Sequence, residues 1–532
     1  MIRSKTIGVL AGSAVLLASS ACADLNVTNP NNPDIERALA SPADVQSVAV
    51  SSLNSWYLAS TNGEGAYMGL AVTADVLTAN FGNFGMRFNN LEPRAPYENN
   101  SAGGDRDVAE TPWSDNYAAL GAANDALRAF ANGIVLDGGQ AETDKYKAIA
   151  LFTQAGSLGN LAWMFDQAFV VDETMDVNAA PPELAPYTEV SAAAQAKWDA
   201  LIALTAGKNE EYDATVLPLV GTSLTSQTLN QLANTMAARQ MVFTARTKAE
   251  TEAINWGQVL AYAEKGISST AGASGKSFDM LVQGDGGTTW YSLNNAYGNL
   301  DSWLRADMRL VHEMDPSQPA KFNGTIVQPN PNPPDARMGT SVTDTEKDYV
   351  FLNKVAGQAS RGVWMQSPWY HARYKAHNWD SPTGLETPVP YILAAENDLM
   401  IAEGLVRTGG DLARAAALIN KTRVGRGHLA PATAADGATG LLAKALYERH
   451  VELVNTGGIE WYDRRRMDDL QEGTFRHLPI PASQLEALSM PIYTFGGVGK
   501  PDMRIAAPNG RIIEFHRAPR ARGASSIQRA NW

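Results

Sequence analysis

Two sequence stretches near the C-terminal end are the most informative about the fold: residues 389–426 read VPYILAAENDLMIAEGLVRTGGDLARAAALINKTRVGR, and residues 447–466 read YERHVELVNTGGIEWYDRRR. Apolar residues recur at helical spacing from Tyr391 to Arg407, which predicts an amphipathic helix. Asp411 can cap a second helix that ends at Arg423. A third helix is expected over residues 441–455. The C-terminal part of the chain is therefore predicted to be a set of helices joined by turns.

Upstream of these phrases the chain contains a series of alanine-rich amphipathic segments. Ser41 and Pro42 can start a first helix, with serine as the N-cap and proline in the first turn. Further helices are expected over residues 113–132, 142–169, 190–205, 228–247 and 256–267. The pattern predicts a mainly α fold of degenerate tetratricopeptide-like helical hairpins, with a scaffold in residues 113–267 and 391–455.

Two long segments break the helical pattern. Residues 80–111 and 270–390 are rich in Gly, Asn, Asp and Pro, and only short β-prone runs such as residues 349–352 occur in them. Long irregular segments inside an ordered domain are usually functional loops or insertions. We therefore expect the ligand-binding region in these two segments.

The C-terminal phrases, followed by LPIPASQLEAL at residues 478–488, resemble the SusD/RagB family of outer-membrane nutrient-binding lipoproteins. The family pattern is an "AE…L..AEA" helix, then "IN..R.R", "ER..E…G.R..DL.R" and "LPIP..E". One departure is the GGIE sequence of residues 457–460, which lacks an arginine that the family often has there. A rearranged interior polar contact is expected from that change.

The N-terminus reads as a secretory leader followed by the single cysteine. Arg3 and Lys5 precede an apolar run that is too short to span a bilayer, and small residues lead into Cys22. We expect a signal peptide at residues 1–21, a lipidated linker at 22–40 and a SusD-like domain at 41–532. Acyl chains on Cys22 would anchor the protein to a membrane. Ordinary cleavage beside an incidental cysteine is the alternative, and Ser19 stands where lipoproteins usually have Leu, Val or Ile.

The candidate binding residues are aromatic and amide side chains in the irregular segments. Sugar rings have apolar faces that stack on aromatic rings, and Asn, Asp and Arg hydrogen-bond sugar hydroxyls. Core packing is the alternative for each aromatic ring. Three groups are predicted to bind the ligand: Trp290, Tyr291, Asn294, Asn295 and Tyr297; Trp364, Trp369 and Tyr370, beside Trp379; and Phe81, Phe84 and Arg87, beside Asn89.

Sequence patterns of catalysis and of metal binding are absent. Glu448 and Glu452, like Glu396 and Glu403, have a spacing that puts each pair on one helix face. Such pairs occur in glycosidases, but we favour ion pairs to nearby arginines, such as Arg449, Arg464 or Arg465, that hold helices together. His371 and His377 are interpreted as surface or loop residues rather than metal ligands.

The family resemblance implies a surface-exposed outer-membrane lipoprotein that binds an oligomeric nutrient. The ligand would be a glycan or an oligopeptide, and the partner a TonB-dependent SusC-like transporter. Neither enzymatic activity nor a cofactor is expected, and the net charge of −13 argues against nucleic acid as a partner. Two alternatives are a helical protein–protein scaffold without a small ligand and a helical-toroid glycoside hydrolase.

Overall fold

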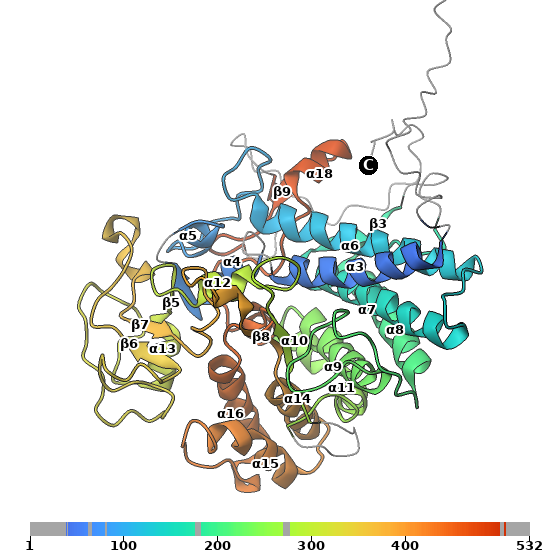
Figure 1. The fold of residues 1–532 in the computed structure, drawn as a ribbon. Coiled ribbons are helices and arrows are strands. Elements are labelled where there is room, and N and C mark those ends of the chain that lie inside the picture. Colours follow the sequence, from blue (N-terminus) through green and yellow to red (C-terminus); the bar gives the residue numbers. More distant parts are fainter. Residues whose placement is uncertain are drawn as a thin grey trace, which may run out of the picture.

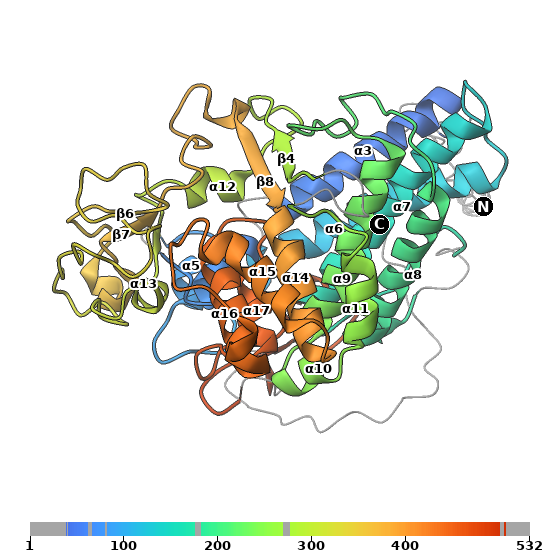
Figure 2. The same ribbon diagram turned by 90° about the horizontal axis from the view of Figure 1, so that it is seen from below.

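The computed structural model describes residues 39, 41–61, 66–79, 82–175, 182–269, 277–500 and 505–506. Cys22, the expected leader at residues 1–21 and Phe81 lie outside the described residues. Figure 1 shows a stack of long helices on one side and a loop-rich part on the other. Figure 2, turned by 90°, shows the same division. The predicted mainly α fold with a large irregular region is confirmed.

The helical stack follows the order of the sequence. Its members are α3 (Pro42–Thr61), α6 (Asp107–Ala131), α7 (Gln140–Met164), α8 (Tyr187–Thr205), α9 (Ser226–Thr244), α11 (Trp256–Ala263), α14 (Ala394–Arg407), α15 (Leu412–Arg423) and α16 (Gly437–Glu452). Helices next to each other in this order pack together. Small residues make the close approach possible, because a Cβ added to Gly156 of α7 would lie 2.5 Å from the indole nitrogen of Trp56 on α3.

The predicted capping residues are confirmed. The backbone N–H of Asp44 donates to the Ser41 hydroxyl at 3.1 Å, and the backbone N–H of Arg414 donates to the Asp411 carboxylate at 2.9 Å. The helix expected over residues 142–169 is wrong at its end, because α7 stops at Met164 and residues 167–169 form strand β2. Similarly, α14 begins only at Ala394, since residues 388–392 form strand β8.

The strands are short and pair in twos. The antiparallel pairs are β1 (Leu77–Ala79) with β5 (Leu304–Ala306), β2 (Gln167–Phe169) with β3 (Leu184–Pro186), β4 (Met280–Gln283) with β8 (Pro388–Ile392), β6 (Tyr349–Phe351) with β7 (Trp369–His371), and β9 (Tyr493–Thr494) with β10 (Ile505–Ala506). Strand β6 confirms the β-prone run. None of the helices in the described ranges is both long and apolar enough to cross a membrane.

Short helices fill the connections. They are α4 (Ala66–Thr73), α5 (Met86–Asn89), α10 (Lys248–Glu252), α12 (Leu293–Gly298), α13 (Met308–Met314), α17 (Glu460–Arg466), α18 (Ala482–Ala487) and the 3₁₀ turns η1 (Ala359–Arg361), η2 (Val363–Met365), η3 (Gly384–Glu386) and η4 (Ala434–Asp436). The segment expected to be a loop at 80–111 therefore contains α5 and the first turn of α6.

Buried ion pairs join α14 to α9 and to α17. The Arg239 guanidinium on α9 donates to both carboxylate oxygens of Glu396 on α14, at 2.8 and 2.6 Å, and neither side chain is exposed. Glu396 is thus paired with an arginine from another helix. Arg466 on α17 likewise pairs with Glu403 on α14 at 2.7 Å. The predicted role of these glutamates in holding helices together is confirmed.

The arginines that pair with the α16 glutamates differ from those expected. Arg337, from the irregular segment, lies 2.9 Å from Glu448 and 3.1 Å from Glu452. The candidate arginines named from the sequence have other partners: Arg449 pairs with Asp463, and Arg464 with Glu313 and Asp469. Sequence spacing could not identify a partner that lies 111 residues away.

Candidate functional site

Four aromatic side chains from three parts of the chain gather on the loop-rich side. They are Phe84, Tyr297, Trp303 and Trp379, and we call this cluster the aromatic platform. The rings of Tyr297 and Trp303 stack with centroids 4.3 Å apart. Trp379 stacks on Tyr297 at 5.8 Å, and Phe84 stacks on Trp303 at 5.7 Å. The platform is a continuous aromatic surface built by three stretches of chain, one of which carries both Tyr297 and Trp303.

Trp379 is the member of the platform that water reaches most. Its side chain is 51% exposed, whereas the other three rings are partly buried. A tryptophan usually buries most of its large ring, so a half-exposed one that rests on other rings is a prepared contact surface. The arrangement can stack on the apolar face of a ligand ring.

Phe84 reaches the platform through an unusual backbone conformation. Its φ angle is +53°, a left-handed value that bulky residues rarely adopt. The following residue, Gly85, also has a positive φ, and its N–H donates to the Asp105 carboxylate at 3.0 Å. Strained conformations of this kind cluster at functional sites. The loop is therefore held in the shape that places Phe84 against Trp303.

Charged side chains border the platform. Asp301 lies two residues before Trp303, and the Lys354 ammonium is 3.9 Å from its carboxylate. Arg87 is exposed on α5. A Cβ added to Gly82 would lie 2.9 Å from the Arg361 guanidinium and 3.4 Å from the Cβ of Arg87, which places both arginines near the start of the Phe84 loop. These groups can hydrogen-bond hydroxyls of a ligand.

The predicted cluster at residues 290–297 is divided between the core and the surface. Trp290 is only 4% exposed and packs on Tyr57 at 5.2 Å, so the expectation that it offers its ring to a ligand is wrong. Asn295 is buried and donates to the backbone carbonyl of Asn455 at 2.8 Å. Tyr291 and Asn294 are partly buried. Tyr297 alone of this group joins the platform.

The second predicted group mostly supports the fold. Trp369 is 1% exposed and packs on Phe351, and the buried Tyr370 donates its hydroxyl to the carbonyl of Asn299. Trp364 is partly buried, and its indole N–H donates to the carbonyl of Asn90 at 2.8 Å. Trp369 and Tyr370 are therefore corrected from ligand contacts to packing residues, whereas the role of the partly buried Trp364 stays a prediction. Trp303 was missed, although it has the same signal as Tyr297: an aromatic ring in an Asn- and Asp-containing segment.

His371 and His377 were interpreted as surface or loop residues, and the surface exposure implied by that interpretation is wrong. Both side chains are 1% exposed. Burial, together with nearby Arg373, lowers the pKa of His371 to about 3, and burial also lowers the pKa of His377. Both rings are therefore neutral at pH 7 and act as buried hydrogen-bonding groups.

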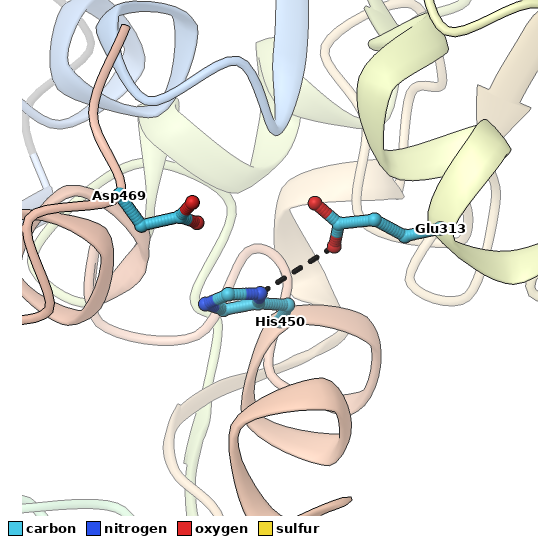
Figure 3. A group of neighbouring side chains, drawn as sticks. All are labelled: Glu313, His450 and Asp469. Carbon is cyan, nitrogen blue, oxygen red and sulfur yellow. Dashed lines mark ion pairs between the residues drawn. The ribbon is translucent and has the colours of Figure 1, made fainter. Parts of the chain in front are cut away.

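Among the described residues, one group of three side chains comes close enough together to suggest a metal site. Glu313, His450 and Asp469 offer ligand atoms within 4.8 Å of one another (Figure 3). The Arg464 guanidinium bridges the two carboxylates, at 2.9 Å from Glu313 and 2.6 Å from Asp469. Arg309 also pairs with Asp469 at 2.7 Å. An arginine already supplies the positive charge here, so the group is an ion-pair cluster.

The electrostatics of this cluster agree with that assignment. Hydrogen bonding to His450 and the charge of Arg464 outweigh burial and lower the pKa of Glu313 to about 2. Burial and Arg464 lower the pKa of His450. The carboxylate is ionised and the imidazole neutral at pH 7, which suits a salt bridge with arginine.

Two larger cavities lie in the helical part. One, of about 400 Å³ beside the start of α14, is lined by charged residues that are paired with each other, such as Lys421 with Asp398 and Arg373 with Glu452. The other, of about 380 Å³ between α8 and α9, is lined by lysine, amide and hydroxyl groups. No platform ring lines either cavity. The aromatic platform therefore remains the best candidate site.

Comparison with known proteins identifies the fold. No family model matches the sequence, and no curated protein matches it. Solved structures do match: a SusD superfamily protein from Parabacteroides distasonis has a TM-score of 0.58 at 14% identity, over 82% of this chain and 96% of that one. A SusD homolog from Bacteroides thetaiotaomicron has a TM-score of 0.55 at 14% identity, over 87% and 98% of the two chains.

A SusD-like carbohydrate binding protein from Bacteroides fragilis matches with a TM-score of 0.54 at 14% identity, over 80% of this chain and 86% of that one. All three matches cover most of both chains and therefore include the helical stack together with the loop-rich part. The chain thus has the fold of the SusD superfamily.

Proposed function

We propose that this protein captures an oligomeric nutrient, with glycan as the ligand class, and holds it on the aromatic platform without chemical change. The main support for the proposal is the half-exposed ring of Trp379, which stacks on Tyr297, while Tyr297 in turn stacks on Trp303. Aromatic faces bind the C–H faces of sugar rings, and the bordering Asp301 and Arg87 supply hydrogen bonds. One of the similar structures is that of a SusD-like carbohydrate binding protein, which supports the same ligand class.

The glutamates of the C-terminal helices are buried and paired with arginines, which agrees with a role in binding without catalysis. Glu396, Glu403 and Glu448 are each at most 1% exposed and each paired with arginine. A glycosidase needs two carboxyl groups on either side of a substrate bond. The proposal therefore assigns these glutamates to the scaffold and expects no hydrolysis products when polysaccharides are incubated with the pure protein.

The proposed setting is the outer membrane. The leader and Cys22 suggest a lipid anchor, and the fold suggests a TonB-dependent SusC-like barrel as the partner that receives the ligand. Mass spectrometry of the mature N-terminus tests the anchor: the account expects an acylated Cys22. Co-purification from native membranes tests the partner, with a large β-barrel transporter as the expected companion.

The ligand class is tested with a panel of neutral and acidic oligosaccharides and of oligopeptides, by isothermal titration calorimetry. The proposal expects binding of at least one oligosaccharide and loss of that binding in Trp379→Ala. Binding of oligopeptides alone would favour the peptide-binding alternative. Failure of every ligand in the panel to bind, alongside tight association with a barrel, would favour a protein–protein scaffold.

A further inference from the structure

Trp379 lies on an irregular segment, yet its ring is held against α12. The segment runs from residue 372 to residue 387, between strands β7 and β8, and we call it the Trp379 loop. Two residues before the half-exposed Trp379, the ring of His377 is 1% exposed. The loop therefore turns one side chain inward and the other outward within three residues.

The His377 ring connects the loop to the helix that carries Tyr297. Its Nε2 lies 3.2 Å from the carbonyl oxygen of Ser292, and its Nδ1 lies 3.1 Å from the hydroxyl and 3.3 Å from the carbonyl oxygen of Thr387. A carbonyl oxygen only accepts, so the tautomer with the proton on Nε2 donates to Ser292, whereas the tautomer with the proton on Nδ1 donates to Thr387 instead. Ser292 is the N-cap of α12, where its hydroxyl accepts from the backbone N–H of Asn295. One imidazole thus links the loop that carries Trp379 to the N-terminus of the helix that carries Tyr297.

The backbone of the loop is fixed from the other side as well. A Cβ added to Gly384 would lie 1.9 Å from the carbonyl oxygen of Asn378, so the turn at Gly384 packs directly on the residue between His377 and Trp379. The Asn378 amide also donates to the carbonyl of Lys375 at 2.8 Å. The Trp379 loop is therefore held by contacts of two consecutive residues, His377 and Asn378.

Helix α12 is itself tied to the scaffold. Asn295 donates to the carbonyl of Asn455, which follows α16, and Tyr370 donates to the carbonyl of Asn299 at the other end of α12. Tyr297 thus sits on a fixed base. The position of Trp379 relative to Tyr297 then depends on the Trp379 loop. The contact of His377 Nε2 with Ser292 links this loop directly to α12.

We infer that His377, in the tautomer that carries its proton on Nε2, is a positioning residue for the aromatic platform: its Nε2–H bond to Ser292 fixes Trp379 against Tyr297 before a ligand arrives. The inference rests on the proposed function for its effect on affinity. Ordering a mobile aromatic side chain during binding reduces affinity, and a ring that is already fixed avoids that loss. His377 therefore contributes to binding without contacting the ligand.

Two amide substitutions test the contacts of the two ring nitrogen atoms separately. In His377→Gln the amide can reach the position of Nε2 and donate to Ser292, whereas in His377→Asn it can reach only the position of Nδ1 and keeps the contact with Thr387. We expect His377→Asn to weaken glycan binding roughly three- to tenfold. We expect His377→Gln to bind within about twofold of the unmodified protein, because it retains the link to α12.

Hydrogen exchange provides a readout that needs no ligand. In His377→Asn, peptides covering residues 376–383 should exchange faster, while peptides of the helical stack should be unchanged. Unchanged exchange in the Trp379 loop of His377→Asn would overturn the inference, and so would equal affinity losses in both variants. If Trp379→Ala leaves glycan binding intact, the proposed function fails, but the exchange result still decides whether His377 holds the loop.

Discussion

Tyr297 and Trp303 are six residues apart in the sequence, and their rings stack with centroids 4.3 Å apart and planes inclined by 27°. This pair is the centre of the aromatic platform, because Trp379 stacks on Tyr297 and Phe84 stacks on Trp303. The two outer rings come from segments more than 70 residues away on either side. The platform therefore exists only in the folded chain.

Removing the exposed ring should abolish most of the affinity and leave the fold intact. In Trp379→Ala we expect glycan affinity to fall roughly five- to tenfold, since an aromatic stacking contact contributes about 1–1.5 kcal/mol. Calorimetry measures the affinity, and thermal unfolding should shift by no more than about 2 °C. Phe88→Ala is the matched control, because Phe88 is 44% exposed on α5 and outside the platform. Equal losses in both variants would contradict the assignment.

Trp290 should behave as a core residue. Trp290→Phe leaves a smaller ring beside Tyr57 and should lower the free energy of unfolding by about 1–3 kcal/mol through the cavity that forms. Ligand affinity of the folded protein should stay within about twofold. Denaturant unfolding and calorimetry on the same preparation make the comparison. A loss of affinity with full stability would return Trp290 to the ligand site.

Glu460 should make stability depend on pH. Burial, partly offset by hydrogen bonds, raises the pKa of this carboxyl to about 7, and its Oε1 accepts from the backbone N–H of Asn455 at 2.8 Å. The folded state therefore binds the proton more tightly than the unfolded state, so this group's contribution to stability is full below about pH 4.5 and falls as the pH rises to about 7.

Glu460→Gln keeps the acceptor for Asn455 and removes that titration. We expect the variant to match the unmodified protein at pH 4.5 and to be more stable at pH 8 by about 1–3 kcal/mol. Urea unfolding at the two pH values measures both. A variant that is less stable at pH 8 would show that the charged form of Glu460 is the favourable one.

The Arg239–Glu396 pair should show strong coupling. Glu396→Leu alone leaves a buried guanidinium without its carboxylate and should cost about 3–5 kcal/mol, whereas Arg239→Met combined with Glu396→Leu should recover much of that loss. A double-mutant cycle by denaturant unfolding measures the coupling. The control is the Arg106–Glu110 pair, which is 49% and 31% exposed and should couple by no more than about 0.5 kcal/mol.

Helical spacing in the sequence was sufficient to predict the scaffold. The caps at Ser41 and Asp411 and the start of α11 at Trp256 lie where local patterns place them. These features depend on neighbouring residues alone. The end of α7 could not be predicted in the same way, because residues 167–169 leave the helix to pair with β3, a tertiary contact.

The site could be predicted only in part. Phe84, Tyr297 and Trp379 were identified from aromatic rings in irregular segments, but Trp290 and Trp369 have the same sequence signal and face the core. A six-residue helix such as α12 has no periodicity long enough to show which side is buried. The partner of Glu448 and the burial of His377 likewise depend on segments that are distant in the sequence.

The most direct test of the platform is a crystal structure with the best-binding oligosaccharide from the panel. We expect a sugar ring stacked parallel to the exposed face of Trp379, with hydroxyls within hydrogen-bonding distance of the charged residues at the border. An oligosaccharide bound in the cavity beside the start of α14, with Trp379 uncovered, would contradict it.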